Sequence, residues 1–170
     1  MSAFRMRCRN ELRSVRCGAA IATAIFFVVV WFIVLFIVGS PRMLLLFAAG
    51  RVAVLPSWLF LTLTVVFYAI MGFCTGAVLF ACRCVNETAK YRGAFFFSIA
   101  VTASFLWYAL AFGARFFLPA LLLAAVVAVG LVITAFNFRR VVRLASWGMW
   151  IAAAWGLYLL LLSLLFFFFL

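Results

Sequence analysis

The chain alternates long apolar runs with short segments that hold most of its charged residues. Five runs reach the roughly 20 apolar residues that a membrane-spanning helix needs. Each run is apolar on all sides, as helices surrounded by lipid are, whereas a membrane barrel would show shorter alternating segments. The pattern therefore predicts an all-α integral membrane protein, a five-helix transmembrane bundle, with helices at about residues 18–38, 57–81, 94–112, 119–138 and 144–170.

Turn residues and cations separate these runs. Residues 1–17 form a basic N-terminal flank, so the transmembrane domain is expected to cover residues 18–170. Only a few residues, around Gly113 to Pro119, lie between the third and fourth helices, which predicts a tight antiparallel pair. Residues 40–56 are less regular, and we expect them to form an interfacial helix or a lid-like loop over the bundle.

The cations are distributed unevenly between the two faces that five spans would create. Eleven of the 14 lie on the face that holds the N-terminus, namely Arg5, Arg7, Arg9, Arg13, Arg16, Arg83, Lys90, Arg92, Arg139, Arg140 and Arg143. The other face holds Arg42, Arg51 and Arg115. Cytoplasmic segments carry an excess of Lys and Arg, so the N-terminus is predicted to be cytoplasmic.

The composition excludes several classes of function. The chain is 72% hydrophobic and 9% charged, which leaves too little polar surface for a soluble domain of 170 residues. Its only acids are Glu11 and Glu87, and histidine is absent. A histidine-based triad, a paired-carboxylate site and a metal site are therefore not expected, and neither is an enzyme. The net charge of +12 is explained by topology and lipid headgroups, so we expect a lipid bilayer as partner and no nucleic acid.

The five cysteines show no disulfide framework. Cys8, Cys17, Cys82 and Cys84 lie near predicted membrane ends, where they are either palmitoylated or plain reduced thiols. The Arg-rich, acid-poor segment that ends at Arg16 is either a topogenic flank or a mitochondrial targeting element.

Small residues recur at a four-residue spacing in two of the predicted helices. Gly72 and Gly76 form a Gly-x-x-x-Gly pair, and Gly148, Ala152 and Gly156 form a second stripe. Small residues let helix backbones approach closely in membranes. The stripes are either packing seams within one chain or surfaces that hold a second copy, as in a homodimer, or another protein.

Tryptophans occupy two depths of the predicted helices. Trp58, Trp147 and Trp150 fall near helix ends, where indoles favour the membrane interface. Trp107 and Trp155 lie deeper. Deep indoles are either core side chains or the walls of a pocket that suits a flat apolar ligand.

Several segments resemble a known family. Residues 55–60 (LPSWLF) and 68–72 (YAIMG) resemble the P-x-W-x-F … L-Y-x-x-M-G signature of the tryptophan-rich sensory protein / translocator protein family, also called the peripheral benzodiazepine receptor family. Residues 105–107 and 111–115 resemble that family's segment N-x-x-W-x-x-x-F-F-G-x-R. Trp155-x-x-Tyr158 follows at the family's spacing, and the resemblance covers about residues 39–163.

This resemblance implies a receptor or transport protein that needs no cofactor and binds flat apolar ligands, such as porphyrins, haem precursors or sterols, within five helices. It implies the outer mitochondrial membrane in a eukaryote and the cell membrane in a bacterium. Thr64 replaces a tryptophan of the family, so porphyrin breakdown is not expected. The implied ligand-binding residues are Trp58, Tyr68, Ser104, Trp107, Trp155 and Tyr158, with Arg51 in the lid available to ligand carboxylates.

Two other functions also fit the sequence. One is a structural or assembly subunit whose glycine seams hold partner proteins, and it would have a packed interior without a cavity. The other is a small transporter for an apolar metabolite. Transport is disfavoured because the predicted spans hold neither acidic groups nor broken polar helices.

Overall fold

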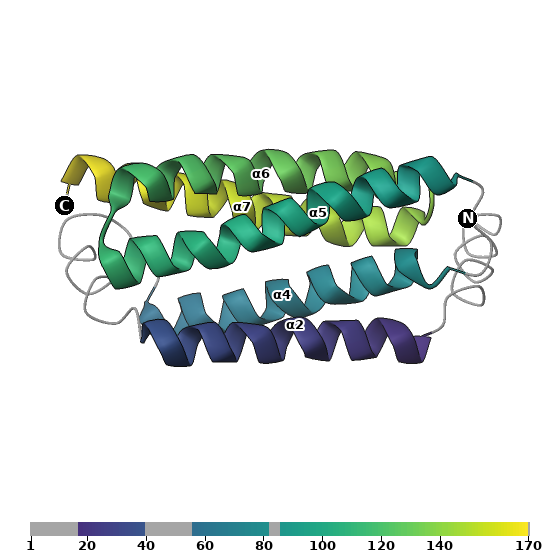
Figure 1. Cartoon of the computed structure of the whole chain (residues 1–170), viewed down its shortest axis with the longest axis horizontal. Helices are drawn as coiled ribbons and strands as arrows, with labels where there is room; N and C mark the ends of the chain where they lie inside the picture. Colours follow the sequence, from purple (N-terminus) through teal and green to yellow (C-terminus); the bar gives the residue numbers. More distant parts are fainter. Residues whose placement is uncertain (1–16, 40–55, 82–85, 170) are drawn as a thin grey trace.

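The structure, a computed structural model, describes residues 17–39, 56–81 and 86–169. In these residues five long helices run alternately in opposite directions along one axis (Figure 1). All five are long and apolar enough to cross a membrane. The predicted all-α five-helix bundle is confirmed, and the protein is a multi-pass integral membrane protein. The helices are α2 (Cys17–Val38), α4 (Ser57–Leu79), α5 (Glu87–Tyr108), α6 (Phe117–Arg139) and α7 (Arg143–Phe169).

The third span is longer than its apolar run. It begins at Glu87 instead of Ala94, because Asn86 caps the helix and its side chain accepts a hydrogen bond of 3.0 Å from the Ala89 N–H. Glu87 also lies in the first turn, where a negative charge complements the helix dipole. The span continues through a π-helical turn, η1 (Ala109–Ala114), and is followed by Arg115 in a left-handed conformation.

The helices form a closed sequence of neighbours. α2 packs on α4, α4 on α7, α7 on α6, and α6 on α5. α5 meets α2 through aromatic side chains, since the rings of Phe97 and Phe27 lie 5.4 Å apart between centroids. The interior therefore receives side chains from all five helices.

Glycines set the distance between α4 and α2. A Cβ atom on Gly72 would lie 2.7 Å from Ala24 Cα, and one on Gly76 would lie 2.7 Å from Ala20 Cα. Across the same seam Thr23 Oγ1 lies 3.0 Å from the Gly72 carbonyl oxygen, which shares the one hydroxyl proton with the Ala19 and Ala20 carbonyls of α2. The Gly72–Gly76 stripe is thus a packing seam within one chain, which is the usual role of small residues between membrane helices.

The stripe on α7 also packs within the chain. A Cβ atom on Gly156 would lie 3.3 Å from Ala128 Cα of α6, and one on Gly148 would overlap Cys74 Sγ of α4. Ala152 is fully buried. Homodimerisation remains a prediction, but these two stripes are already occupied by neighbouring helices.

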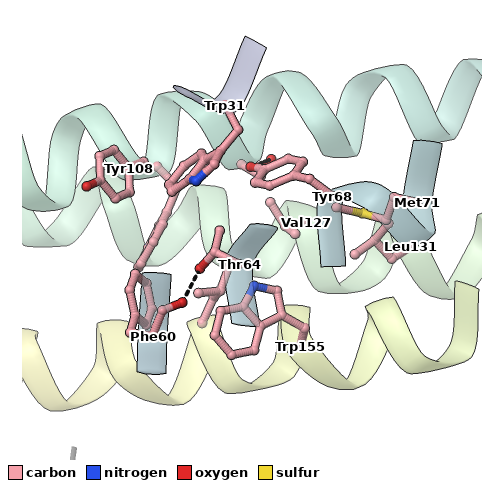
Figure 2. A pocket seen from close by; sticks show the side chains of 12 residues that line it. Trp31, Phe60, Thr64, Tyr68, Met71, Tyr108, Val127, Leu131 and Trp155 are labelled. Carbon is pink, nitrogen blue, oxygen red and sulfur yellow. Dashed lines mark hydrogen bonds between the residues drawn. The ribbon is translucent and has the colours of Figure 1, made fainter. Parts of the chain in front are cut away.

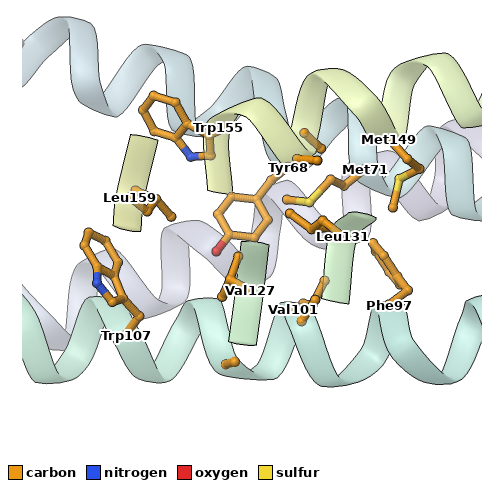
Figure 3. Packing of buried hydrophobic residues seen from close by; sticks show 14 of the residues in the cluster. Tyr68, Met71, Phe97, Val101, Trp107, Val127, Leu131, Met149, Trp155 and Leu159 are labelled. Carbon is orange, nitrogen blue, oxygen red and sulfur yellow. The ribbon is translucent and has the colours of Figure 1, made fainter. Parts of the chain in front are cut away.

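Large apolar side chains fill the space between the helices, and the outside of the bundle is apolar as well. Figure 3 shows part of this core, in which Trp107, Trp155 and Leu159 pack near Tyr68. In α2 only Ala20 and Trp31 are buried, because most of that helix faces outward. An apolar exterior of this kind is solvated by lipid tails.

The charges of the described residues lie at helix ends. Lys90 and Arg92 lie in the first turns of α5, and Arg139, Arg140 and Arg143 surround the short α6–α7 turn at the same end of the bundle. Arg115 lies at the opposite end, between η1 and α6 (Figure 1). The arrangement of the helices therefore agrees with the uneven charge distribution of the sequence. The lid segment 40–56 lies, except for Pro56, outside the described residues.

Candidate functional site

A small cavity lies between the helices and receives side chains from all five of them (Figure 2). Its volume, measured as the space open to the centre of a water molecule, is about 20 Å³. One water molecule needs about 10–15 Å³ by this measure, so the cavity admits a group of roughly that size without movement of its walls. The lining residues are Trp31, Phe60, Thr64, Tyr68, Met71, Ser104, Trp107, Tyr108, Val127, Leu131, Trp155 and Leu159.

The two deep tryptophans singled out from the sequence both line this cavity. Trp107 of α5 is 2% exposed and Trp155 of α7 is 7% exposed, so neither indole faces the lipid. Their side chains approach the same space from different helices (Figure 3).

Hydrogen bonds and ring contacts fix both indoles. The Trp107 indole N–H donates to Ser163 Oγ at 2.7 Å, and Ser163 in turn donates to the Leu159 carbonyl at 2.8 Å. The Trp155 ring stacks on Phe67, with centroids 4.7 Å apart and planes 14° from parallel. The two indoles therefore form rigid walls.

Tyr68 and Ser104 also line the cavity and are hydrogen-bonded to each other at 2.7 Å. Ser104 Oγ donates to the Val101 carbonyl, also at 2.7 Å, so its own proton is used and Tyr68 donates to Ser104. The Tyr68 ring lies between Trp31 and Phe105, with centroids 5.1 Å from each. This stack joins α2, α4 and α5 into a second aromatic wall.

Three residues predicted as ligand contacts have other positions. Tyr158 is not part of the cavity lining, but its ring stacks on Trp155 at 5.0 Å and supports that wall from behind. Trp58 is 67% exposed and lies outside the cavity, because it faces outward in the first turn of α4, where an indole suits the membrane interface. Arg51 lies outside the described residues.

The sequence did not single out Trp31, Phe60 or Tyr108, which also line the cavity. Trp31 had the same signal as the other deep tryptophans, an indole far from the ends of an apolar run. α2 is apolar all round, however, so no periodicity indicated which of its faces points inward. Tyr108 donates a hydrogen bond of 3.0 Å to the Gly39 carbonyl and ties the end of α5 to the end of α2.

The Trp31 indole N–H has no hydrogen-bond partner among the described residues, although it is buried. A buried donor left without an acceptor costs about 1–3 kcal/mol. The other lining donors discussed so far, the Trp107 N–H and the Tyr68 and Ser104 hydroxyls, all have acceptors. The cavity wall therefore contains a donor whose hydrogen-bonding capacity is not met by the protein.

The lining is mostly apolar and aromatic, with a few polar groups. It offers aromatic and aliphatic side chains, hydroxyls and the indole N–H groups of three tryptophans, and none of the described residues that line it is acidic or basic. Within residues 17–39, 56–81 and 86–169, no three His, Cys, Asp or Glu side chains gather as a metal site. Of the candidate lipidation sites, Cys17 is exposed at the start of α2, and Cys8, Cys82 and Cys84 lie outside the described residues.

The fold and site thus define a multi-pass membrane protein with an aromatic cavity inside its helical bundle. No protein-family model, no curated protein and no solved structure matches this chain.

Proposed function

We propose that this protein is a membrane receptor or transport protein that binds a flat apolar molecule between its helices. The observation that carries the proposal is the cavity whose walls are formed by Trp31, Tyr68, Trp107 and Trp155. The resemblance to the translocator protein family favours porphyrins or sterols as ligands. The same resemblance favours the outer mitochondrial membrane in a eukaryote or the cell membrane in a bacterium.

Burial of aromatic surface would drive binding. Each square ångström of apolar surface removed from water contributes about 25 cal/mol before the costs of association. An offset-stacked ring pair adds about 0.5–1.5 kcal/mol. Trp155 already stacks on Phe67 and Tyr158, and Tyr68 on Trp31 and Phe105. A planar ligand would therefore contact the ring edges that line the cavity or take the place of one stacked neighbour.

The volume of the cavity limits this proposal. A space of about 20 Å³ does not hold a tetrapyrrole or a sterol, so a ligand of that size must move the side chains of the walls. The small volume also supports a second function, a structural or assembly subunit with a solid interior. Saturable ligand binding distinguishes the two.

The test uses the full chain in lipid nanodiscs, titrated with protoporphyrin IX and with fluorene as a smaller flat probe. We expect Trp155→Ala to weaken binding about tenfold, since it removes a stacked ring and its buried surface. Trp147→Ala is the matched control on the same helix, because Trp147 is 69% exposed and outside the cavity. Equal affinity in the two variants, or no saturable binding beyond empty nanodiscs, would refute the proposed function.

A further inference from the structure

We propose that the Trp31 indole N–H is the hydrogen-bond donor of an acceptor subsite, so that the ligand is a flat apolar molecule with a neutral acceptor oxygen, such as an aromatic ketone. The inference rests on the proposed function and adds the chemistry of the ligand. Two observations carry it: the buried N–H without a partner among the described residues, and the cavity that the same side chain lines.

The position of the Trp31 ring is fixed by its neighbours. The side chain is 1% exposed. Its ring stacks on Tyr68 with planes 21° apart, and it packs in a T-shaped arrangement with Tyr108, with centroids 4.6 Å apart. Figure 2 shows the ring nitrogen of Trp31 on the side of the other lining residues. The donor is therefore held in place, and a ligand meets a preorganised N–H.

The hydroxyls of the lining are already used as donors. Thr64 donates to the Phe60 carbonyl at 2.7 Å, Tyr68 to Ser104, and Tyr108 to the Gly39 carbonyl. These groups cannot give a proton to a ligand oxygen without losing a bond within the protein. Among the described residues, the indole N–H groups of Trp31 and Trp155 are under no such constraint. Of the two, that of Trp31 is the fully buried donor, and an acceptor placed there removes the cost of an unpaired buried donor.

The lining residues that the structure describes include no Lys or Arg, which favours a neutral acceptor. A buried carboxylate without a cation is much less favourable than a buried carbonyl that accepts a hydrogen bond. A ketone, ester or ether oxygen is therefore the favoured partner, and any carboxylate of a larger ligand must remain outside the cavity.

A matched pair of probes tests this inference, namely 9-fluorenone, which carries a carbonyl on three fused rings, and fluorene, which lacks it. Binding to the full chain in nanodiscs is measured by equilibrium dialysis against empty nanodiscs. We expect the wild type to bind fluorenone about tenfold more tightly than fluorene, the size of one net hydrogen bond. Trp31→Phe should abolish this preference, and the ratio of the two affinities is the readout, because the smaller ring also changes the wall that fluorene contacts. Trp147→Phe, on the outer face of α7, should retain the preference.

Replacement of Trp31 by 3-benzothienylalanine keeps both fused rings and removes only the N–H. It decides the matter if the smaller phenylalanine side chain prevents folding. If both Trp31 variants still prefer the ketone, or if the wild type binds fluorene at least as tightly as fluorenone, the acceptor subsite is refuted and the proposed function stands. If neither compound binds the wild type, the proposed function fails, and the subsite fails with it.

Discussion

The substitution Gly72→Ala tests whether the close seam between α4 and α2 holds the bundle together. The added Cβ atom would lie 2.7 Å from Ala24 Cα and 2.8 Å from the Thr23 carbonyl oxygen. Carbon atoms in contact prefer separations of about 3.5–4.0 Å, so the two helices must move apart by about 1 Å. Both neighbours are backbone atoms, and no side-chain rotation relieves the overlap.

Overpacking of this kind costs about 1–3 kcal/mol. The movement also stretches the hydrogen bond from Thr23 to the Gly72 carbonyl, which is 3.0 Å long. We therefore expect Gly72→Ala to lower the free energy of unfolding by about 2 kcal/mol or more. The free energy is measured by reversible unfolding in mixed detergent micelles.

Gly18→Ala is the matched control, because no atom of the described residues lies within 4 Å of a Cβ atom built on Gly18. Its effect should stay within about 0.5 kcal/mol. If Gly72→Ala unfolds at the same point as Gly18→Ala, the seam is not the close contact described above. If Gly72→Ala instead dissociates a dimer while the monomer keeps its stability, the stripe binds a second copy.

Two further substitutions test the walls of the cavity. Ser163→Ala leaves the buried Trp107 N–H without its acceptor and should destabilise the protein by about 1–3 kcal/mol. The control Ser98→Ala removes an exposed hydroxyl that bonds to a carbonyl of its own helix, and it should change the unfolding free energy by less than about 0.5 kcal/mol. Equal losses of stability in the two variants would contradict the role of Ser163. Val127→Ile adds a methyl group to the wall of the small cavity and should weaken fluorene binding about tenfold, whereas Val126→Ile on the outer face should not; unchanged binding in Val127→Ile would place the ligand elsewhere.

The fold followed from the sequence because the membrane imposes a length on each apolar run. That rule predicted the number of helices, and the uneven distribution of Lys and Arg predicted which helix ends lie on the same side of the membrane. The length rule places the start of α5 at Ala94, too late, because the first turns of the helix hold several polar residues and Asn86 caps the helix before them. Capping depends on one side chain and its geometry, which hydropathy does not report.

Only some of the residues that line the cavity could be predicted from the sequence. Depth within a run identified Trp107 and Trp155, because indoles away from the interface need an internal environment. Depth alone did not separate Trp31 from the lipid-facing residues around it, since all of α2 is apolar. The family signature includes Trp58 among the ligand contacts, yet the direction of its side chain depends on how α4 is rotated in the bundle. That rotation is set by the glycine seams, whose partner helices only the packed structure shows.

The packing of the seams also bears on how a cavity for one water-sized group would accept a ligand of several rings. At Gly72 and Gly156 the helix backbones are so close that an added Cβ atom would lie 2.7 Å and 3.3 Å from a backbone atom of the neighbouring helix. Opening either seam would therefore break many van der Waals contacts at once. In the described residues α2 and α5 are joined through side chains, namely the edge-to-face rings of Phe27 and Phe97, the rings of Trp31 and Tyr108, and the hydrogen bond from Tyr108 to the Gly39 carbonyl. Each ring pair is worth about 0.5–1.5 kcal/mol. We therefore expect a ligand to separate α2 from α5 first. Trp31 lies on α2 and Tyr68 on α4, so an opening that keeps the α2–α4 seam closed leaves the unpaired N–H beside Tyr68 and moves it away from Tyr108 of α5.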